Sequence, residues 1–369
     1  MKILGLILLS LASLSLSCKS GVEETYLVGT YTSSSSEGIN IIQFDASNKE
    51  IKIQQVIDNI DNPSFVVANR NKKIVVAVGE TEGKNGGQVV SFWYDKKTKS
   101  FTRINSLHTL GNHPCTVAFS PDEKYVLVGN YTGGNISVFK IDEKGQLSEN
   151  PQLLQYSGKS INAERQEKPH VHCIVFHPIE NKIFVADLGL DNIKMIPFNT
   201  NYHSFLEENK EIDFKVNPGA GPRHLVWNKE GTKLYVTFEL TNEVAVFDYK
   251  NDNLTLLQTI SLTKPTKSGS AAELRLSADE RFLYASVRGK DNKLVVIKVD
   301  ENNSLEKIQE IETEETPRNF IITANQKNIL VGNQKSNSIV VYDRDKNTGL
   351  LINTKNKVSI PKPVYFYPF

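Results

Sequence analysis

The chain has 369 residues, and 39% of them are hydrophobic, so it can bury a large core. Its 43 basic and 42 acidic side chains give a formal net charge of +1 at pH 7. This balance creates no field that would attract nucleic acid. We therefore expect a folded protein without a nucleic-acid partner, whose ligand, if it has one, is a small molecule.

The N-terminal segment has the pattern of an export signal. A charged start precedes an uncharged, mostly apolar run over residues 3–16, which ends in a serine and Cys18. This order is typical of secretory signal peptides. The run is too short to span a membrane, which takes about 20 apolar residues. Because the ending SLSC resembles a bacterial lipobox, we predict a signal peptide over 1–17, lipidation at Cys18 and a tether over 18–24.

These features predict an exported cell-envelope lipoprotein, in the periplasm or at the outer membrane, that touches a membrane only through its N-terminal lipid. Ordinary secretion is the alternative. Cys115 and Cys173 are the two other cysteines. In an exported protein they can form a disulfide or remain buried thiols, and the sequence leaves both possibilities open.

Strand patterns follow in a fixed order, beginning with a second, third and fourth strand over 26–31, 39–44 and 51–56. Each later unit starts with an apolar first strand that a proline or small residue opens. First strands are expected at 63–68, 114–119, 171–176, 222–227, 271–276, 317–322 and 363–368. Second strands, rich in β-branched and aromatic residues, are expected at 26–31, 74–79, 125–130, 183–188, 234–239, 283–288 and 329–334. Third strands follow turns at 39–44, 88–93, 135–140, 192–197, 243–248, 293–298 and 338–343, and more polar fourth strands follow them.

The repeat predicts an all-β fold, a seven-bladed β-propeller with four-stranded blades over residues 25–369. The first strands start 46 to 57 residues apart, and short strands at such a period are typical of propellers. The chain opens with a second strand and closes with a first strand. We therefore expect the strand at 363–368 to pair with the strand at 26–31, which would close the ring and hide two open edges.

Polar side chains recur where the first strands begin and the second strands end. In a propeller both positions lie on one face, around the mouth of the central channel, where loops from rigid elements build sites. The set contains Tyr31, Asn62, Glu80, His113, Asn130, Tyr131, His170, His172, Asp187, Arg223, His224, Glu239, Glu273, Arg275, Arg288, Arg318, Asn319, Asn333 and Gln334. This collection of arginines, acids and imidazoles suits an anionic or polar ligand and proton transfer.

Each of these signals has a simpler interpretation. His170 and His172 share a strand face and could bind a metal, but spacing identifies no third ligand, so we predict no metal and no cofactor. Glu273 and Arg275 could form a structural ion pair between blades. Asp187 could merely cap a turn.

Several segments resemble the bacterial lactonase family of seven-bladed propellers, which includes one type of 6-phosphogluconolactonase and the fungal carboxymuconate-lactonizing enzyme. The resemblance is carried by RQEKPHVHCIVF (165–176), FVADLGLDNI (184–193), GAGPRHLVW (219–227), YVTFELTNEVAVFDY (235–249), SAAELRLSADERFLYASVRG (270–289) and the segment from TPRNF to SIVVY (316–342). It covers essentially the whole mature chain. It implies a lactone hydrolase that needs no cofactor.

The resemblance also implies the catalytic residues, which are His172 or His170, Arg223, Glu239 and Arg275 or Arg288. Together with the strand-end positions it gives His172, His170, Arg223, Glu239 and Arg275 as catalytic candidates. The substrate-binding candidates are His224, Glu273, Arg288, Arg318, Asn319, Gln334, His113 and Asp187. This chain departs from the family at Val287, where an asparagine is usual before the arginine.

We expect a small anionic or polar lactone as the substrate. A histidine or Glu239 would take a proton from water, and Arg223 would stabilise the oxyanion. A non-catalytic binding propeller of the envelope and a muconate cycloisomerase are the alternatives.

Overall fold

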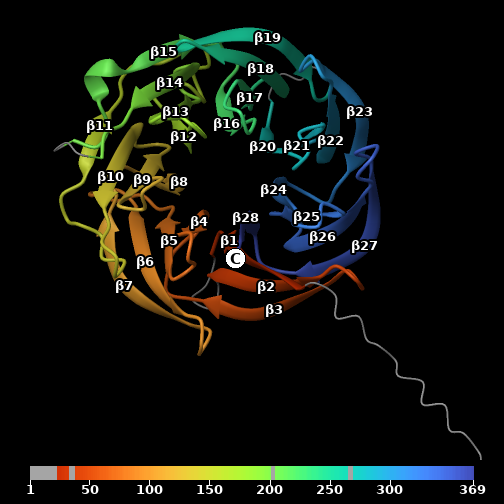
Figure 1. The fold of residues 1–369 in the computed structure, drawn as a ribbon, viewed down its shortest axis with the longest axis horizontal. Coiled ribbons are helices and arrows are strands. Elements are labelled where there is room, and N and C mark those ends of the chain that lie inside the picture. Colours follow the sequence, from red (N-terminus) through yellow and green to blue (C-terminus); the bar gives the residue numbers. More distant parts are fainter. Residues whose placement is uncertain (1–22, 33–37, 201–203, 265–268) are drawn as a thin grey trace, which may run out of the picture.

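The computed structural model describes residues 23–32, 38–200, 204–264 and 269–369. In this part of the chain, seven four-stranded antiparallel sheets surround a central channel, and Figure 1 shows them as blades of a ring. The prediction of an all-β, seven-bladed propeller is confirmed. The predicted signal peptide and Cys18 lie outside the described residues. None of the described residues belongs to a helix long and apolar enough to cross a membrane.

Each blade contributes one strand to each of four layers around the channel. The innermost strands are β4 (Val66–Ala68), β8 (Pro114–Phe119), β12 (Val171–Phe176), β16 (Pro222–Trp227), β20 (Ala271–Leu276), β24 (Pro317–Ile322) and β28 (Pro363–Pro368). The second strands are β1 (Glu23–Thr30), β5 (Ile74–Gly79), β9 (Tyr125–Asn130), β13 (Lys182–Asp187), β17 (Lys233–Phe238), β21 (Phe282–Val287) and β25 (Asn328–Asn333).

The two outer layers complete the blades. The third strands are β2 (Ile39–Asp45), β6 (Gln88–Asp95), β10 (Asn135–Lys140), β14 (Asn192–Pro197), β18 (Glu243–Lys250), β22 (Lys293–Val299) and β26 (Ser338–Arg344). The outermost strands are β3 (Glu50–Ile57), β7 (Ser100–His108), β11 (Gln152–Gln155), β15 (Ile212–Lys215), β19 (Asn253–Ser261), β23 (Leu305–Glu312) and β27 (Leu351–Ser359). A short 3₁₀ helix, η1 (Glu208–Lys210), precedes β15.

The largest deviation from the predicted strands is in β4, which was expected to begin at Pro63. Only Val66–Ala68 pairs with β5. Asn62 has a positive φ of 47°, and the Ser64 N–H bonds back to the Asn62 carbonyl. The chain therefore turns at the proline, and the strand begins only after the turn.

The last strand closes the ring, as predicted. β28 pairs with β1 in antiparallel register, with Leu27 opposite Tyr367 and Val28 opposite Phe366. Figure 1 shows the blue end of the chain beside its red beginning. The first and last segments thus share one blade, and β28 covers the inner edge that β1 would otherwise leave unpaired,.

The core lies between adjacent blades. All six residues of β5 are buried, because blades pack against both faces of the sheet. One apolar cluster, for example, joins Leu127 of β9 and Ile136 of β10 to Ile183 and Val185 of the next blade. Burying one such aliphatic side chain contributes roughly 1.5–3 kcal/mol. The blades are therefore held rigid, and the polar residues of the innermost strands are held with them.

Six of the seven innermost strands share an irregularity near their first residue. In β12 the register passes from Val171 to Cys173 without pairing His172, and in β16 it passes from Pro222 to Leu225. Similar shifts occur in β8, β20, β24 and β28. Such β-bulges re-aim side chains and recur next to active sites. The residues left at these bulges are Cys115, His172, Arg223, His224, Ala272, Glu273, Arg318 and Val364.

Candidate active site

A cavity of about 220 Å³ lies at the mouth of the channel. It forms where the bulged starts of innermost strands meet the ends of second strands from several blades. Its lining residues are Tyr31, Glu80, Cys115, Tyr131, Arg165, His172, Glu239, Arg288 and Arg318. We call it the mouth cavity.

Glu239 is the electrostatic centre of the mouth cavity. Its Oε1 accepts a 2.7 Å hydrogen bond from Arg165 Nη2. Its Oε2 lies 2.8 Å from Arg223 Nε and 3.2 Å from Arg288 Nη2. Burial opposes ionisation of Glu239, but Arg288, Arg223 and Arg165 outweigh it and lower the pKa to about 2. The carboxylate therefore stays charged and gathers three guanidinium groups.

Arg223 is only 2% exposed, yet it is incompletely bonded. Its Nε and Nη1 are buried and make no hydrogen bond within the described residues, although Nε is in ion-pair contact with Glu239. Unbonded buried donors are costly, and in native proteins they call for an explanation such as a ligand site. Arg288, by contrast, is anchored, since its Nε donates to the Ser270 carbonyl at 3.1 Å. Burial lowers the pKa of Arg288 to about 9, so it remains charged at neutral pH.

A fourth arginine reaches the mouth cavity from β24, in the blade next to that of Arg288. Arg318 Nη2 donates to the Tyr31 hydroxyl at 2.8 Å and stacks over that ring. The Tyr31 hydroxyl in turn donates to Glu80 Oε1 at 2.8 Å, and the Ser64 hydroxyl donates to the other oxygen of Glu80. The second carboxylate of the cavity is therefore also bonded by neighbouring side chains.

The two histidines of the PHVH segment differ in their surroundings. His170 uses both ring nitrogens, with Nδ1 3.0 Å from the Tyr131 carbonyl oxygen and Nε2 3.2 Å from Glu167 Oε2. His172 lines the mouth cavity, and its buried Nδ1 has no hydrogen-bond partner in the described residues. Burial, reinforced by Arg223 and other nearby cations, lowers the pKa of His172 well below its usual range. His172 is therefore a neutral imidazole with an unused nitrogen.

A narrow point lies next to the mouth cavity, with only about 20 Å³ of free space. His172, Arg223, His224 and Arg318, all left at bulges, line it. His224 Nδ1 lies 3.0 Å from Glu273 Oε1. Its ring meets that of His172 edge to face, with 5.4 Å between centroids. We call this narrow point the constriction.

The predicted mouth position of Arg275 is wrong. In β20, Arg275 pairs with Tyr284, four residues before Arg288, which corresponds to about 13 Å along a strand. Arg275 and Glu273 line a different cavity, beyond the constriction. The two side chains do form the ion pair that was the alternative, but it is long, with 3.6 Å between Arg275 Nη2 and Glu273 Oε2. Asn319 lines the constriction and donates to Glu273.

Three other predicted site residues do not line the mouth cavity. Asp187 accepts hydrogen bonds from the N–H groups of His170 and Leu190, at 2.8 and 3.1 Å, and so orders the turn. Burial raises its pKa to about 6. His113 bonds through Nδ1 with Thr132, and Gln334 lies on the rim, where its N–H donates to the Thr316 carbonyl.

Arg165 is the functional candidate that the sequence reasoning missed. It lies in the long connection between β11 and β12, outside any strand, and reaches back to Glu239 and to the Tyr131 hydroxyl at 3.2 Å. Its side chain is 39% exposed, against 2% for Arg223 and 13% for Arg288. The signal available was its place in the RQEKPHVH segment that carries the family resemblance.

Cys115 and Cys173 are both free thiols. Burial raises the pKa of Cys115 well above its usual range, and its thiol points at the backbone carbonyls of Val171 and His172, at 3.6 and 3.7 Å. Within the described ranges, no three or more His, Cys, Asp or Glu side chains are arranged to hold a metal ion.

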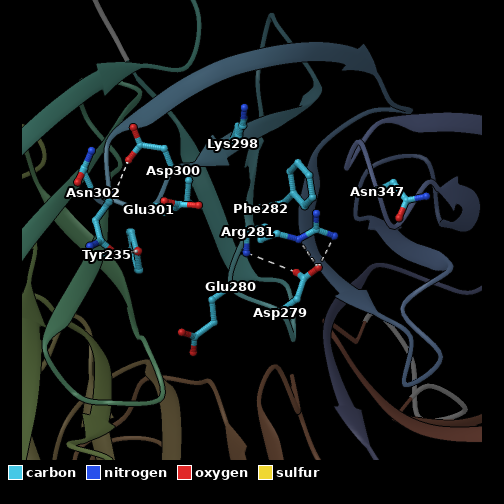
Figure 2. A pocket seen from close by; sticks show the side chains of 12 residues that line it. Tyr235, Asp279, Glu280, Arg281, Phe282, Lys298, Asp300, Glu301, Asn302 and Asn347 are labelled. Carbon is cyan, nitrogen blue, oxygen red and sulfur yellow. Dashed lines mark hydrogen bonds and ion pairs between the residues drawn. The ribbon is translucent and has the colours of Figure 1, made fainter.

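A larger pocket, of about 760 Å³, lies on the face opposite the mouth. Figure 2 shows its side chains, which come from turns such as Asp279–Arg281 and Asp300–Asn303. Asp279 accepts from Arg281 Nε at 2.9 Å, and Asp300 accepts from the Asn302 N–H at 2.9 Å. These polar groups are bonded within their turns, and Glu280 and Arg281 also bond to turns of neighbouring blades. We call it the outer pocket.

The propeller with a cationic, buried mouth defines a class of protein. A family model described as "Lactonase, 7-bladed beta-propeller" matches residues 25–368, and the chain belongs to this family.

Individual relatives cover nearly the whole chain. A Bacillus subtilis 6-phosphogluconolactonase is 30% identical over 343 residues, which is 91% of this chain and 96% of the relative. The structure of a periplasmic gluconolactonase from Pseudomonas aeruginosa superimposes with a TM-score of 0.87 at 30% identity, covering 94% of this chain and 99% of that one. A Bacteroides fragilis structure with a provisional 6-phosphogluconolactonase assignment has a TM-score of 0.88 at 34% identity, covering 96% and 99%.

Proposed function

We propose that this protein is a lactone hydrolase of the 6-phosphogluconolactonase type, and that hydrolysis takes place in the mouth cavity. The observation that carries the proposal is a pair of buried nitrogens without a hydrogen-bond partner in the described residues, Nη1 of Arg223 and Nδ1 of His172, on two residues that line the constriction together. One can stabilise an oxyanion, and the other can accept a proton. Family membership supplies the reaction type.

The reaction needs three events at one carbonyl. Water attacks the lactone carbonyl carbon and gives its proton to His172. Charge then builds on the carbonyl oxygen, where the unbonded Nη1 of Arg223 stabilises it. The ring C–O bond breaks, the leaving oxygen takes back the proton from His172, and the product is a hydroxy acid.

His172 is the better base among the candidates. Three arginines already occupy the oxygens of Glu239 and hold its pKa at about 2, so it binds a proton poorly. Both nitrogens of His170 are engaged. Glu239 therefore acts as a positioning residue that orients the arginines, and His170 supports the ring of Tyr131, on which it stacks at 4.3 Å.

The charge around the mouth cavity selects an anionic substrate. Arg165, Arg288 and Arg318 line it and Arg223 adjoins it, against the carboxylates of Glu80 and Glu239. Four guanidinium groups thus face two carboxylates. Guanidinium forks bind carboxylate or phosphate in two-point fashion. We assign a sugar or sugar-acid lactone that carries, or on hydrolysis gains, an anionic group.

The N-terminal pattern adds a location to the proposal. A secretory signal and Cys18 fit an exported lipoprotein of the cell envelope,. The Pseudomonas aeruginosa relative is described as periplasmic. Mass spectrometry of Cys18 in the membrane fraction, with Cys18→Ser as the control, would test the lipid anchor. A soluble, unlipidated wild-type protein would contradict it.

The function is tested by proton release at constant pH from a lactone panel. The purified protein is mixed with 6-phosphogluconolactone, gluconolactone or a muconolactone, and heat-denatured protein gives the spontaneous rate. We expect acceleration of at least one sugar lactone, and the ratio of the first two rates reports whether phosphate is recognised. If no lactone is opened faster than the denatured control, the proposal fails, and a binding propeller becomes the better interpretation.

A further inference from the structure

The channel holds a second cavity that the proposed reaction does not use. It has a volume of about 570 Å³ and lies along the middle and far ends of the innermost strands. The constriction, with about 20 Å³ of free space, separates it from the mouth cavity. We call it the lower cavity.

The polar groups of the lower cavity are unequally bonded. Glu273 accepts hydrogen bonds from the Leu274 N–H at 3.0 Å and from Asn319, and it pairs with His224 at 3.0 Å. Its oxygens are therefore occupied. The contact of Arg275 Nη2 with Glu273, at 3.6 Å, exceeds hydrogen-bond length, and Arg275 Nε is buried without a partner in the described residues. The cation thus keeps free donors, whereas both oxygens of the anion are already bonded.

The remaining wall of the lower cavity is aromatic and aliphatic. Phe65 and Tyr365 stack with ring centroids 3.7 Å apart, and Ala118, Val226 and Leu276 add apolar surface. Binding sites for small molecules are typically apolar pockets with a few convergent polar groups. A stacked aromatic pair next to a guanidinium is suited to a flat body that ends in a carboxylate.

We propose that the lower cavity is a second binding site, which takes a small organic carboxylate with a planar or apolar body. The carboxylate lies on the free N–H groups of Arg275, and the body packs against Tyr365 and the aliphatic wall. A cationic ligand is disfavoured because Glu273 has its oxygens occupied. The site is independent of the lactonase reaction in the mouth cavity, and it binds its ligand whether or not a lactone is hydrolysed.

The proposal is tested with 4-bromobenzoate as the probe and 4-bromobenzyl alcohol as the uncharged comparator. Anomalous diffraction from a soaked crystal locates the bromine, and calorimetric titration in solution measures affinity. We expect bromine in the lower cavity and carboxylate-dependent binding. Arg275→Gln should weaken that binding at least tenfold, whereas Arg165→Gln at the mouth should leave it unchanged.

A second variant keeps the test decisive if Arg275→Gln fails to fold. Ala118→Trp fills the lower cavity without altering any charge, and thermal melting verifies its fold. It should abolish probe binding. Bromine found only in the mouth cavity, or affinity unchanged in Ala118→Trp or in folded Arg275→Gln, would overturn the proposal.

Discussion

The mouth cavity and the outer pocket are opposites in size and chemistry. The outer pocket is larger, about 760 against 220 Å³. Its charged groups, however, belong to solvated turns and already bond within those turns or to the turns of neighbouring blades. The mouth cavity is small, but it places four arginines around two carboxylates and leaves buried donors unbonded. The proposed site is therefore not the larger pocket but the smaller cavity, where charged groups from several blades converge and buried donors stay unbonded,.

The largest effect is expected from the buried arginine. Arg223→Ala removes the free donors at the constriction, and loss of one oxyanion donor typically lowers kcat about 10²–10³-fold. Initial rates of lactone opening measure it. Arg223→Lys is the matched control, since it keeps the charge but loses the guanidinium fork, and it should recover only part of the rate. Activity of Arg223→Ala within threefold of wild type would remove this arginine from the mechanism.

The next prediction compares His172 with His170, the two histidines of the PHVH segment. His172→Ala should lower kcat about 100-fold, because it deletes the proton acceptor. His170→Ala, its neighbour two residues away, should lower kcat less than tenfold and act mainly on the melting temperature. The same assay at several pH values adds a check. Since the pKa of His172 lies below its usual value, wild-type kcat/KM should hold from pH 8 to below 6.5. The reverse ranking of the two variants would identify His170 as the base.

Glu239 should link stability to acidity. Its pKa is about 2 in the folded protein against an ordinary 4.5, so its stabilisation is full above pH 4.5 and disappears as pH falls toward 2. The shift corresponds to about 3 kcal/mol. Urea titrations at pH 6, 4 and 3 measure the free energy of unfolding. Glu239→Gln should remove this share of the pH dependence, and equal slopes in both proteins would contradict the assignment.

Arg165 should affect substrate binding more than chemistry. It is the exposed guanidinium of the mouth cavity and bonds Glu239 from a loop. Arg165→Gln should raise KM for an anionic lactone roughly tenfold with little change in kcat. Lys168→Gln removes the same charge from an exposed position of the same loop and should change KM less than twofold. Equal effects of the two variants on KM would mean that substrate binding depends on the overall positive charge near the mouth and not on the position of Arg165.

The outer pocket should give the smallest effect. Glu301→Gln alters an exposed residue on its rim, and surface substitutions usually change stability by less than about 0.5 kcal/mol. We expect kcat/KM within twofold of wild type and an unchanged melting curve. A strong loss of activity would reverse the comparison and move the site to the opposite face.

The fold could be predicted from the sequence because the same strand patterns recur along the chain. Seven copies of each strand pattern specify the blades and their closure, and the polar ends of those strands identified Arg223, Glu239 and His172. The depth of Arg275 could not be predicted, since it depends on where the β20 register shifts, and no residue pattern marks a bulge. Arg165 was not predicted as a site residue because its loop has no counterpart in the other repeats. The different bonding of His170 and His172 arises from groups distant in sequence.

The bulges of the innermost strands have an evolutionary consequence. Each one sets a side chain outside the paired ladder, so a substitution at that position does not change the pairing of the strand. The six bulged strands therefore present equivalent positions around one axis. In this protein these positions carry a thiol, imidazoles, guanidinium groups, a carboxylate and aliphatic groups. A new ligand specificity can therefore arise by substituting one bulge residue at a time, while the pairing of the seven blades is retained.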